Sequence, residues 1–297
     1  MIVNGKGIAI KIIEMLDDIP FGKHYFEVGI ILRDSLLVSS VLFNSEAWYN
    51  LTESELDLLE TVDLLFLRKL LKAPKGTPKE MLFLELGCLP LREIIRGRRL
   101  NFLHYILNED PKSMIYRVLQ SQLKSRTKKD WVTTVIEDMK KLELNVKMEE
   151  IRKTKKTSWK QVIKEKIKNY TFDKLEKRKL SHSKVENVEH CGINMQKYLK
   201  PNKTKISKED SQLIFKLRCR VTKAKENLKG IYDNLECSAC GKEEESQKHI
   251  VLCEELNKEQ NNKKVNYDKI FNGTVTEKLI IAKIFKENFD ILENMKK

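Results

Sequence analysis

Glycine and proline are scarce in this sequence, with 11 and 6 among its 297 residues. Both residue types concentrate at turns, so their scarcity argues against a sandwich of many short strands and excludes a collagen-like chain. Apolar residues make up 41 % of the chain, which is enough to build a core and excludes a wholly disordered protein. We therefore expect a mostly α-helical protein.

Long apolar segments are also absent. No run approaches the roughly 20 apolar residues that cross a bilayer, so we expect no membrane partner. The residues after Met1 lack the apolar stretch and the small-residue cleavage site of a secretory signal. We therefore expect an intracellular protein in a reducing compartment, where clustered cysteines serve as metal ligands more readily than as disulfides.

The familiar catalytic motifs are missing too. The sequence contains no GxxxxGK[ST], GxSxG, HExxH or GxGxxG pattern. The acidic pair Asp17–Asp18 has no flanking apolar strands, so we interpret it as a solvated helix end rather than a polymerase metal site. We assign no catalytic residue and expect no small-molecule substrate.

Basic charge is what the sequence has in excess. The formal net charge is +14, and it is unevenly placed, because residues 112–229 contain 33 Lys and Arg against 14 Asp and Glu. Such a surplus is typical of proteins with a polyanionic partner, most often nucleic acid. We divide the chain into a helical bundle over residues 1–110, a lysine-rich helical linker over 111–205 and a C-terminal region over 206–297.

Apolar residues spaced three and four apart, together with capping signals, locate the expected helices. The signals are Thr and Glu three residues apart at Thr52 and at Thr77, a proline at Pro90 and a capping serine at Ser207. The last segment is apolar on one side and predicts an amphipathic closing helix. The predicted helices are Tyr25–Phe43, Glu53–Leu71, Pro78–Leu86, Leu91–Leu107, Asp130–Leu142, Ser158–Leu180, Ser207–Gly230 and Thr276–Met295.

Two of these helices carry clustered basic residues. Guanidinium forks match the geometry of backbone phosphates, so arginines on the helix Leu91–Leu107 are candidates for contact with nucleic acid. The alternative is a solvated basic face without a partner. The helix that begins at Ser207 is expected to expose a second set on one side. The candidate residues are Arg92, Arg96, Arg98, Arg99, Lys216, Arg218, Arg220 and Lys223.

One group of residues has the spacing of a metal site. Cys237, Cys240, His249 and Cys253 follow the pattern C-x2-C-x8-H-x3-C. Two thiolates two residues apart fit one tight turn, and a histidine and a cysteine four apart fit one helical turn. Four protein ligands fill a tetrahedral zinc site, so we predict structural rather than catalytic zinc. The alternative is a pair of free buried thiols beside an unrelated histidine.

Several motifs occur in an order that resembles a known family. They are Ile19–Lys23, Leu42–Trp48, Thr77–Glu80, Leu84–Gly87, Pro90–Arg92 and Arg98–Asn101. Together they resemble the stretch just after the polymerase palm in reverse transcriptases of non-LTR (LINE-type) retrotransposons. The later Leu217–Arg220, Cys237–Cys240 and Gln247–Cys253 are similar to the zinc knuckle near the C-terminus of those polyproteins.

The resemblance implies a thumb-like helical bundle, a basic helical linker, a small Cys3His zinc knuckle at residues 237–253 and a C-terminal helix. In the family, an RNA-directed DNA polymerase grips the template–primer duplex with its thumb, and the knuckle helps to bind element RNA or target DNA. The aromatic-x-Asp-Asp motif of the palm is absent from this sequence. We therefore expect a nuclear, nucleic-acid-binding C-terminal fragment without polymerase activity of its own.

Two alternatives remain at this point. A zinc-stabilised module could bind protein instead, with its lysines serving solubility. The chain could also be a non-functional remnant of a retroelement.

Overall fold

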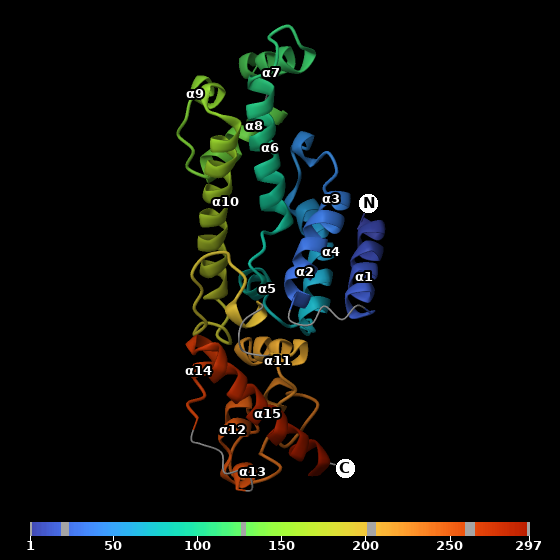
Figure 1. The fold of residues 1–297 in the computed structure, drawn as a ribbon, viewed down its shortest axis with the longest axis vertical. Helices are drawn as coiled ribbons and strands as arrows, with labels where there is room; N and C mark the ends of the chain where they lie inside the picture. Colours follow the sequence, from blue (N-terminus) through green and yellow to red (C-terminus); the bar gives the residue numbers. More distant parts are fainter. Residues whose placement is uncertain (1, 19–23, 126–128, 201–205, 259–264, 296–297) are drawn as a thin grey trace.

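The fold is mostly α-helical, as the sequence predicts. The computed structural model describes residues 2–18, 24–125, 129–200, 206–258 and 265–295, and within these ranges it contains no β-strand, only two isolated β-bridges. Figure 1 shows an elongated molecule in which the segment from α11 to α15 forms one end. The motif Ile19–Lys23 and the predicted boundary at residue 205 lie outside the described residues.

Three groups of helices follow one another along the chain. The first group comprises α1 (Ile2–Asp18), α2 (Tyr25–Leu32), a π-helical turn (Arg33–Val38), α3 (Ser39–Val41), α4 (Glu53–Leu71), α5 (Lys79–Leu86) and α6 (Leu91–Leu107). The second comprises α7 (Met114–Ser125), α8 (Trp131–Lys141), α9 (Met148–Lys153) and α10 (Lys156–Lys179). The third comprises α11 (Lys208–Arg218), α12 (Gln247–Leu252), α13 (Glu254–Asn257), α14 (Lys269–Asn272) and α15 (Val275–Met295).

The starts of the predicted helices lie within two residues of those in the structure. Thr52 accepts a hydrogen bond from the Glu55 amide while the Glu55 carboxylate accepts one from the Thr52 amide, so the predicted capping box is present. Asp130 and Ser207 cap α8 and α11 with their side chains, which accept from the Thr133 and Asp210 amides. The helix predicted after Thr77 is present as α5, but Thr77 does not cap it, because Pro78 is the capping residue and no described group bonds the buried Thr77 hydroxyl.

The helix predicted from Ser207 to Gly230 is shorter than expected. α11 ends at Arg218, because Arg220 adopts a left-handed conformation with φ of +50° and the Val221 amide turns back to donate to the Lys216 carbonyl. No glycine marks this ending, and a non-glycine residue rarely adopts positive φ. The chain that follows leads into the cysteine turn instead of extending the helix.

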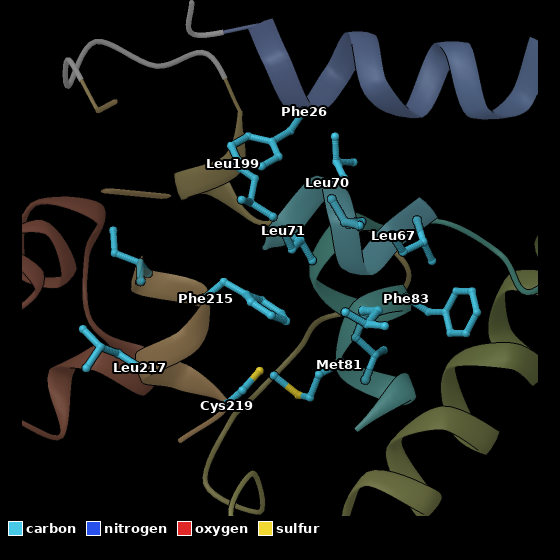
Figure 2. Packing of buried hydrophobic residues seen from close by; sticks show 14 of the residues in the cluster. Phe26, Leu67, Leu70, Leu71, Met81, Phe83, Leu199, Phe215, Leu217 and Cys219 are labelled. Atoms are coloured by element: carbon cyan, nitrogen blue, oxygen red, sulfur yellow. The ribbon is translucent and has the colours of Figure 1, made fainter. Parts of the chain in front are cut away.

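One hydrophobic core joins the N-terminal helices to the C-terminal end of the molecule. Buried residues from Ala9 in α1 to Leu292 in α15 belong to a single cluster. Figure 2 shows Phe215 of α11 pointing toward the helices that carry Leu71 and Met81. The zinc-ligand candidates and the N-terminal bundle therefore share a continuous core.

A second core fixes the region that we predicted to be a linker. α7, α8, α9 and α10 pack on the C-terminal half of α6 around Leu103, Trp131 and Trp159. The Trp131 indole donates to the Glu46 carbonyl at 2.8 Å, and the Trp159 indole donates to the Leu100 carbonyl at 3.0 Å. This basic segment is thus a packed part of the body, with most of its lysines on the outside of a helical layer and Lys179 buried.

A buried polar network holds the three groups of helices together. Glu85 of α5 is fully buried and lies 2.9 Å from Arg218 of α11. Its carboxylate also accepts a hydrogen bond from the Tyr198 hydroxyl at 2.7 Å and lies 3.1 Å from His190 Nε2. The other ring nitrogen of His190 lies 3.0 Å from Glu176 of α10. Burial raises the pKa of Glu85, but these partners outweigh it, so the pKa lies below its ordinary value.

The stability of the protein should depend on the charge of His190. Burial lowers the pKa of His190, but its bonds to Glu176 and Glu85 outweigh burial and the opposing Arg218 charge, so the pKa lies above the ordinary 6.5. A raised folded-state pKa gives stability that is full below pH 6.5 and is lost as pH rises through the folded value. We expect wild type to lose stability above pH 6.5 relative to His190→Gln in urea denaturation. Parallel pH profiles of the two proteins would contradict this.

Candidate metal centre and basic surface

The cysteine turn brings two thiols to the same side of the chain. The Cys237 amide donates to the Glu243 carbonyl, and the Gly241 amide donates to the Cys237 carbonyl, each at 2.8 Å. Gly241 has φ of +63°, a conformation that glycine adopts without strain. The reversal places Cys240 back beside Cys237, as the C-x2-C spacing predicts.

Helix α12 supplies the other two donors. The Ser246 hydroxyl caps the helix by accepting from the His249 amide at 3.0 Å. Cys253 follows the last helical residue, and its amide still donates to the His249 carbonyl at 2.7 Å. His249 and Cys253 therefore lie one helical turn apart on the side that faces the cysteine turn.

The four side chains form a group that can hold a metal ion. The Sγ atoms of the three cysteines and a ring nitrogen of His249 all lie within 4.8 Å of one another. Cys240 Sγ and His249 Nε2 are 3.3 Å apart. A tetrahedral ion with bonds of about 2.3 Å to sulfur separates its ligand atoms by about 3.8 Å, and no pair in this group is more than about 1 Å farther apart than that.

The surroundings orient the histidine and distinguish the thiols. His249 Nδ1 lies 3.0 Å from the Glu243 carboxylate, an arrangement that directs Nε2 toward the thiols. The backbone amide of Lys242 lowers the pKa of Cys240 to about 7, whereas burial raises the pKa of Cys253 to about 11. Every thiol must lose its proton to bind a metal. Deprotonation costs most at the buried Cys253, so metal binding would have to offset that cost mainly there.

Polar side chains fasten the metal centre to the rest of the molecule. Lys225 donates to the Glu236 carbonyl at 2.7 Å and lies 3.5 Å from the buried Glu245. Gln247 donates to the Leu217 carbonyl at the end of α11. Asn288 of α15 donates to the Ile250 carbonyl within α12 at 2.7 Å. Contacts with both α11 and α15 therefore fix the position of the metal centre in the molecule.

The arginines of α6 form ion pairs and hydrogen bonds within the protein. Arg92 pairs with three carboxylates of α4, and Arg96 and Arg99 both pair with Asp138 of α8. The side chains of these arginines are 9 %, 8 % and 9 % exposed. Arg98 donates to the Leu42 carbonyl. Contact with nucleic acid and a solvated basic face both require exposed arginines, whereas Arg92, Arg96 and Arg99 are nearly buried because they pair with carboxylates of neighbouring helices.

The basic residues predicted to be exposed on and after α11 differ in their burial. Arg218 is fully buried against Glu85, so the expectation that it is exposed is wrong. The Arg220 guanidinium lies over the Phe271 ring at 5.2 Å, and the residue is half-buried. Lys216 is half-buried and Lys223 is exposed. The structure does not bring these residues together with the arginines of α6.

The sequence also contains a basic row that we did not predict. Lys156, Lys160, Lys164 and Lys168 recur every fourth residue along α10, and the first three are exposed. Residues at this spacing share one side of a helix, here over about 18 Å. None of the four forms an ion pair with any residue in the described parts of the chain. We call these four residues the lysine row. The regular spacing was the signal that could have identified it.

Comparisons of the chain with protein-family models, with curated proteins and with solved structures find no match. No helix among the described residues is both long and apolar enough to cross a membrane.

Proposed function

We propose that this protein binds nucleic acid through the lysine row of α10, with zinc at the Cys3His centre maintaining the C-terminal end of the fold. By its resemblance, it corresponds to the part of a non-LTR retrotransposon reverse transcriptase that follows the palm, with a thumb-like bundle and a zinc knuckle. It catalyses nothing by itself, and its expected place is the nucleus.

Zinc is the metal that the donor set favours. Three thiolates and one imidazole are ligands typical of structural zinc, and four protein ligands leave no position for a reactive water. Calcium and magnesium prefer oxygen ligands and would be excluded. The role of zinc here is to hold the cysteine turn against α12.

The observation that carries the proposal is the uncompensated charge of the lysine row. Like charges four residues apart destabilise a helix by about 0.2–0.5 kcal/mol per pair, so a row of this kind is unfavourable unless a partner neutralises it. Lys160, Lys164 and Lys168 each directly follow a buried residue of α10, so they lie along one flank of the helix. In Figure 1, α10 runs along the outer side of the molecule, opposite α1. A phosphate backbone would offset these charges and release counterions.

Replacing the lysine row by glutamine should weaken binding to a single-stranded RNA by about tenfold or more, because about four phosphate contacts are removed. The matched control replaces Lys6, Lys11, Lys283 and Lys286, which are exposed on α1 and α15, and removes the same net charge. Fluorescence anisotropy with a labelled 20-nucleotide RNA measures both. Equal losses in the two variants would show that only overall charge matters and would contradict a specific surface.

A second candidate function is supported by one feature. Trp48, Tyr49, Leu51 and Leu58 line an apolar hollow of about 500 Å³, and Tyr49 and Leu58 are half exposed. An apolar surface of this kind suits a protein partner. Heparin or unlabelled RNA in excess should displace a bound nucleic acid but should leave a protein bound at this hollow in place, which separates the two functions.

A further inference from the structure

A second cavity lies where residues 189–200 meet the start of α15. Its volume is about 580 Å³, and it is remote from the lysine row in sequence. Three lysines line it, Lys197, Lys200 and Lys278, against the single carboxylate of Glu189. The lining therefore carries a formal excess of two positive charges.

Lys278 is the unusual member of this group. Its side chain lies on α15, only 8 % of the residue is exposed, and it lines the cavity. Among the described residues its ammonium has no hydrogen-bond or ion-pair partner, and it lies 5.9 Å from the centre of the Tyr198 ring. The Glu85 carboxylate acts on the Lys278 charge from a distance, but its hydrogen bonds go to Arg218 and Tyr198. A buried ammonium without an anion is costly, and burial lowers the pKa of Lys278 to about 8.

The start of α15 adds to the positive potential. Thr274 and Val275 line the same cavity, and α15 is 21 residues long, so its N-terminal amides and its dipole favour an anion. The Glu277 carboxylate accepts from the Thr274 amide and hydroxyl, and so caps the helix. The Glu277 charge also acts on the neighbouring Lys278, but the two side chains form no ion pair or hydrogen bond.

We propose that this cavity binds a phosphate group, held by the Lys278 ammonium at the start of α15 with Lys200 at the rim. A phosphate monoester carries about −1.5 to −2 charges near neutral pH, so it would offset the charges of Lys278 and Lys200. The Asn194 and Asn272 amides also line the cavity and offer further donors. This inference does not rest on the proposed function, because free phosphate satisfies the same chemistry as the terminal phosphate of a nucleic-acid strand.

Calorimetric titration with inorganic phosphate, at an ionic strength fixed with chloride, tests the site. Wild type and the control Lys286→Met, an exposed lysine on the same helix, should bind phosphate equally. Lys278→Met should bind it at least about tenfold more weakly, because the only buried cation of the lining is lost. Absence of phosphate binding by the wild type, or unchanged binding by Lys278→Met, would overturn the proposal.

A rim variant keeps the test decisive if Lys278→Met fails to fold. Lys200 is exposed, so Lys200→Met should fold and should weaken phosphate binding about threefold, while unchanged affinity would count against the site. Oligothymidylates with and without a 5′-phosphate then identify the source of the ligand. A preference for the phosphorylated strand that disappears in Lys200→Met assigns a strand end. Phosphate binding without such a preference assigns free phosphate, and both results support the site.

Discussion

Substitution of Cys237 by serine should abolish zinc binding and unfold the C-terminal end of the molecule. The Cys237 residue is 1 % exposed, and a serine hydroxyl is a poor zinc ligand, so the site would keep only three donors. Structural zinc contributes about 10–16 kcal/mol of apparent binding energy in small modules, which is comparable with the entire stability of a typical domain. Bound zinc per chain and the midpoint of thermal unfolding measure the effect.

The effect should extend beyond the metal centre. Cys237 and Cys253 belong to the same hydrophobic cluster as Phe66 and Leu82, so loss of the metal should lower the unfolding temperature of the whole protein. Cys191→Ser is the matched control, because Cys191 is exposed and outside the ligand group. That variant should retain about one zinc per chain. A Cys237→Ser protein that keeps both its zinc and its unfolding temperature would contradict the assignment.

Substitution of Glu85 by glutamine should destabilise the protein by about 3–5 kcal/mol, because it leaves the buried Arg218 charge without its carboxylate. The remaining donations of Arg218, to the carbonyls of Ile270 and Phe271, do not neutralise it. Urea denaturation at pH 7 measures the difference. Asp57→Asn is the control, because Asp57 also pairs with an arginine but its side chain is 63 % exposed, and its loss should cost at most about 1 kcal/mol.

The pH dependence of stability distinguishes loss of the Glu85–Arg218 charge interaction from a purely steric effect of the substitution. The pKa of Glu85 is lowered in the folded protein, so its stabilising contribution is present above the ordinary value of 4.5 and is lost as pH falls through the folded value. The gap in stability between wild type and Glu85→Gln should therefore shrink in acid. A gap that stays constant from pH 7 to pH 3 would point to packing rather than charge.

Local interactions explain what the sequence could predict. The capping box at Thr52 involves residues three apart, and all four metal-ligand candidates lie between Cys237 and Cys253, so the spacing alone indicates their proximity. The closing helix α15 follows from its apolar periodicity. These features need no knowledge of how the helices pack.

Tertiary partners explain what the sequence could not predict. Arg218 looked like an exposed residue of a basic helix, but its carboxylate partner lies in α5, more than a hundred residues earlier in the chain. Likewise, Arg96 and Arg99 meet Asp138 only because α8 packs on α6. The sequence around a charged side chain does not show whether that side chain faces water or a distant carboxylate. The second core, which makes the basic segment a packed layer, likewise depends on contacts between residues far apart in the chain.

The salt dependence of RNA binding by the zinc-loaded protein tests the central claim most directly. The logarithm of the binding constant should fall linearly with the logarithm of salt concentration, with a slope of about −3 for four phosphate contacts on a single strand. The variant in which glutamine replaces the lysine row should lose most of that slope, and the α1 and α15 control should keep it. Binding that is insensitive to salt, or an equal slope in the lysine-row variant, would contradict the account.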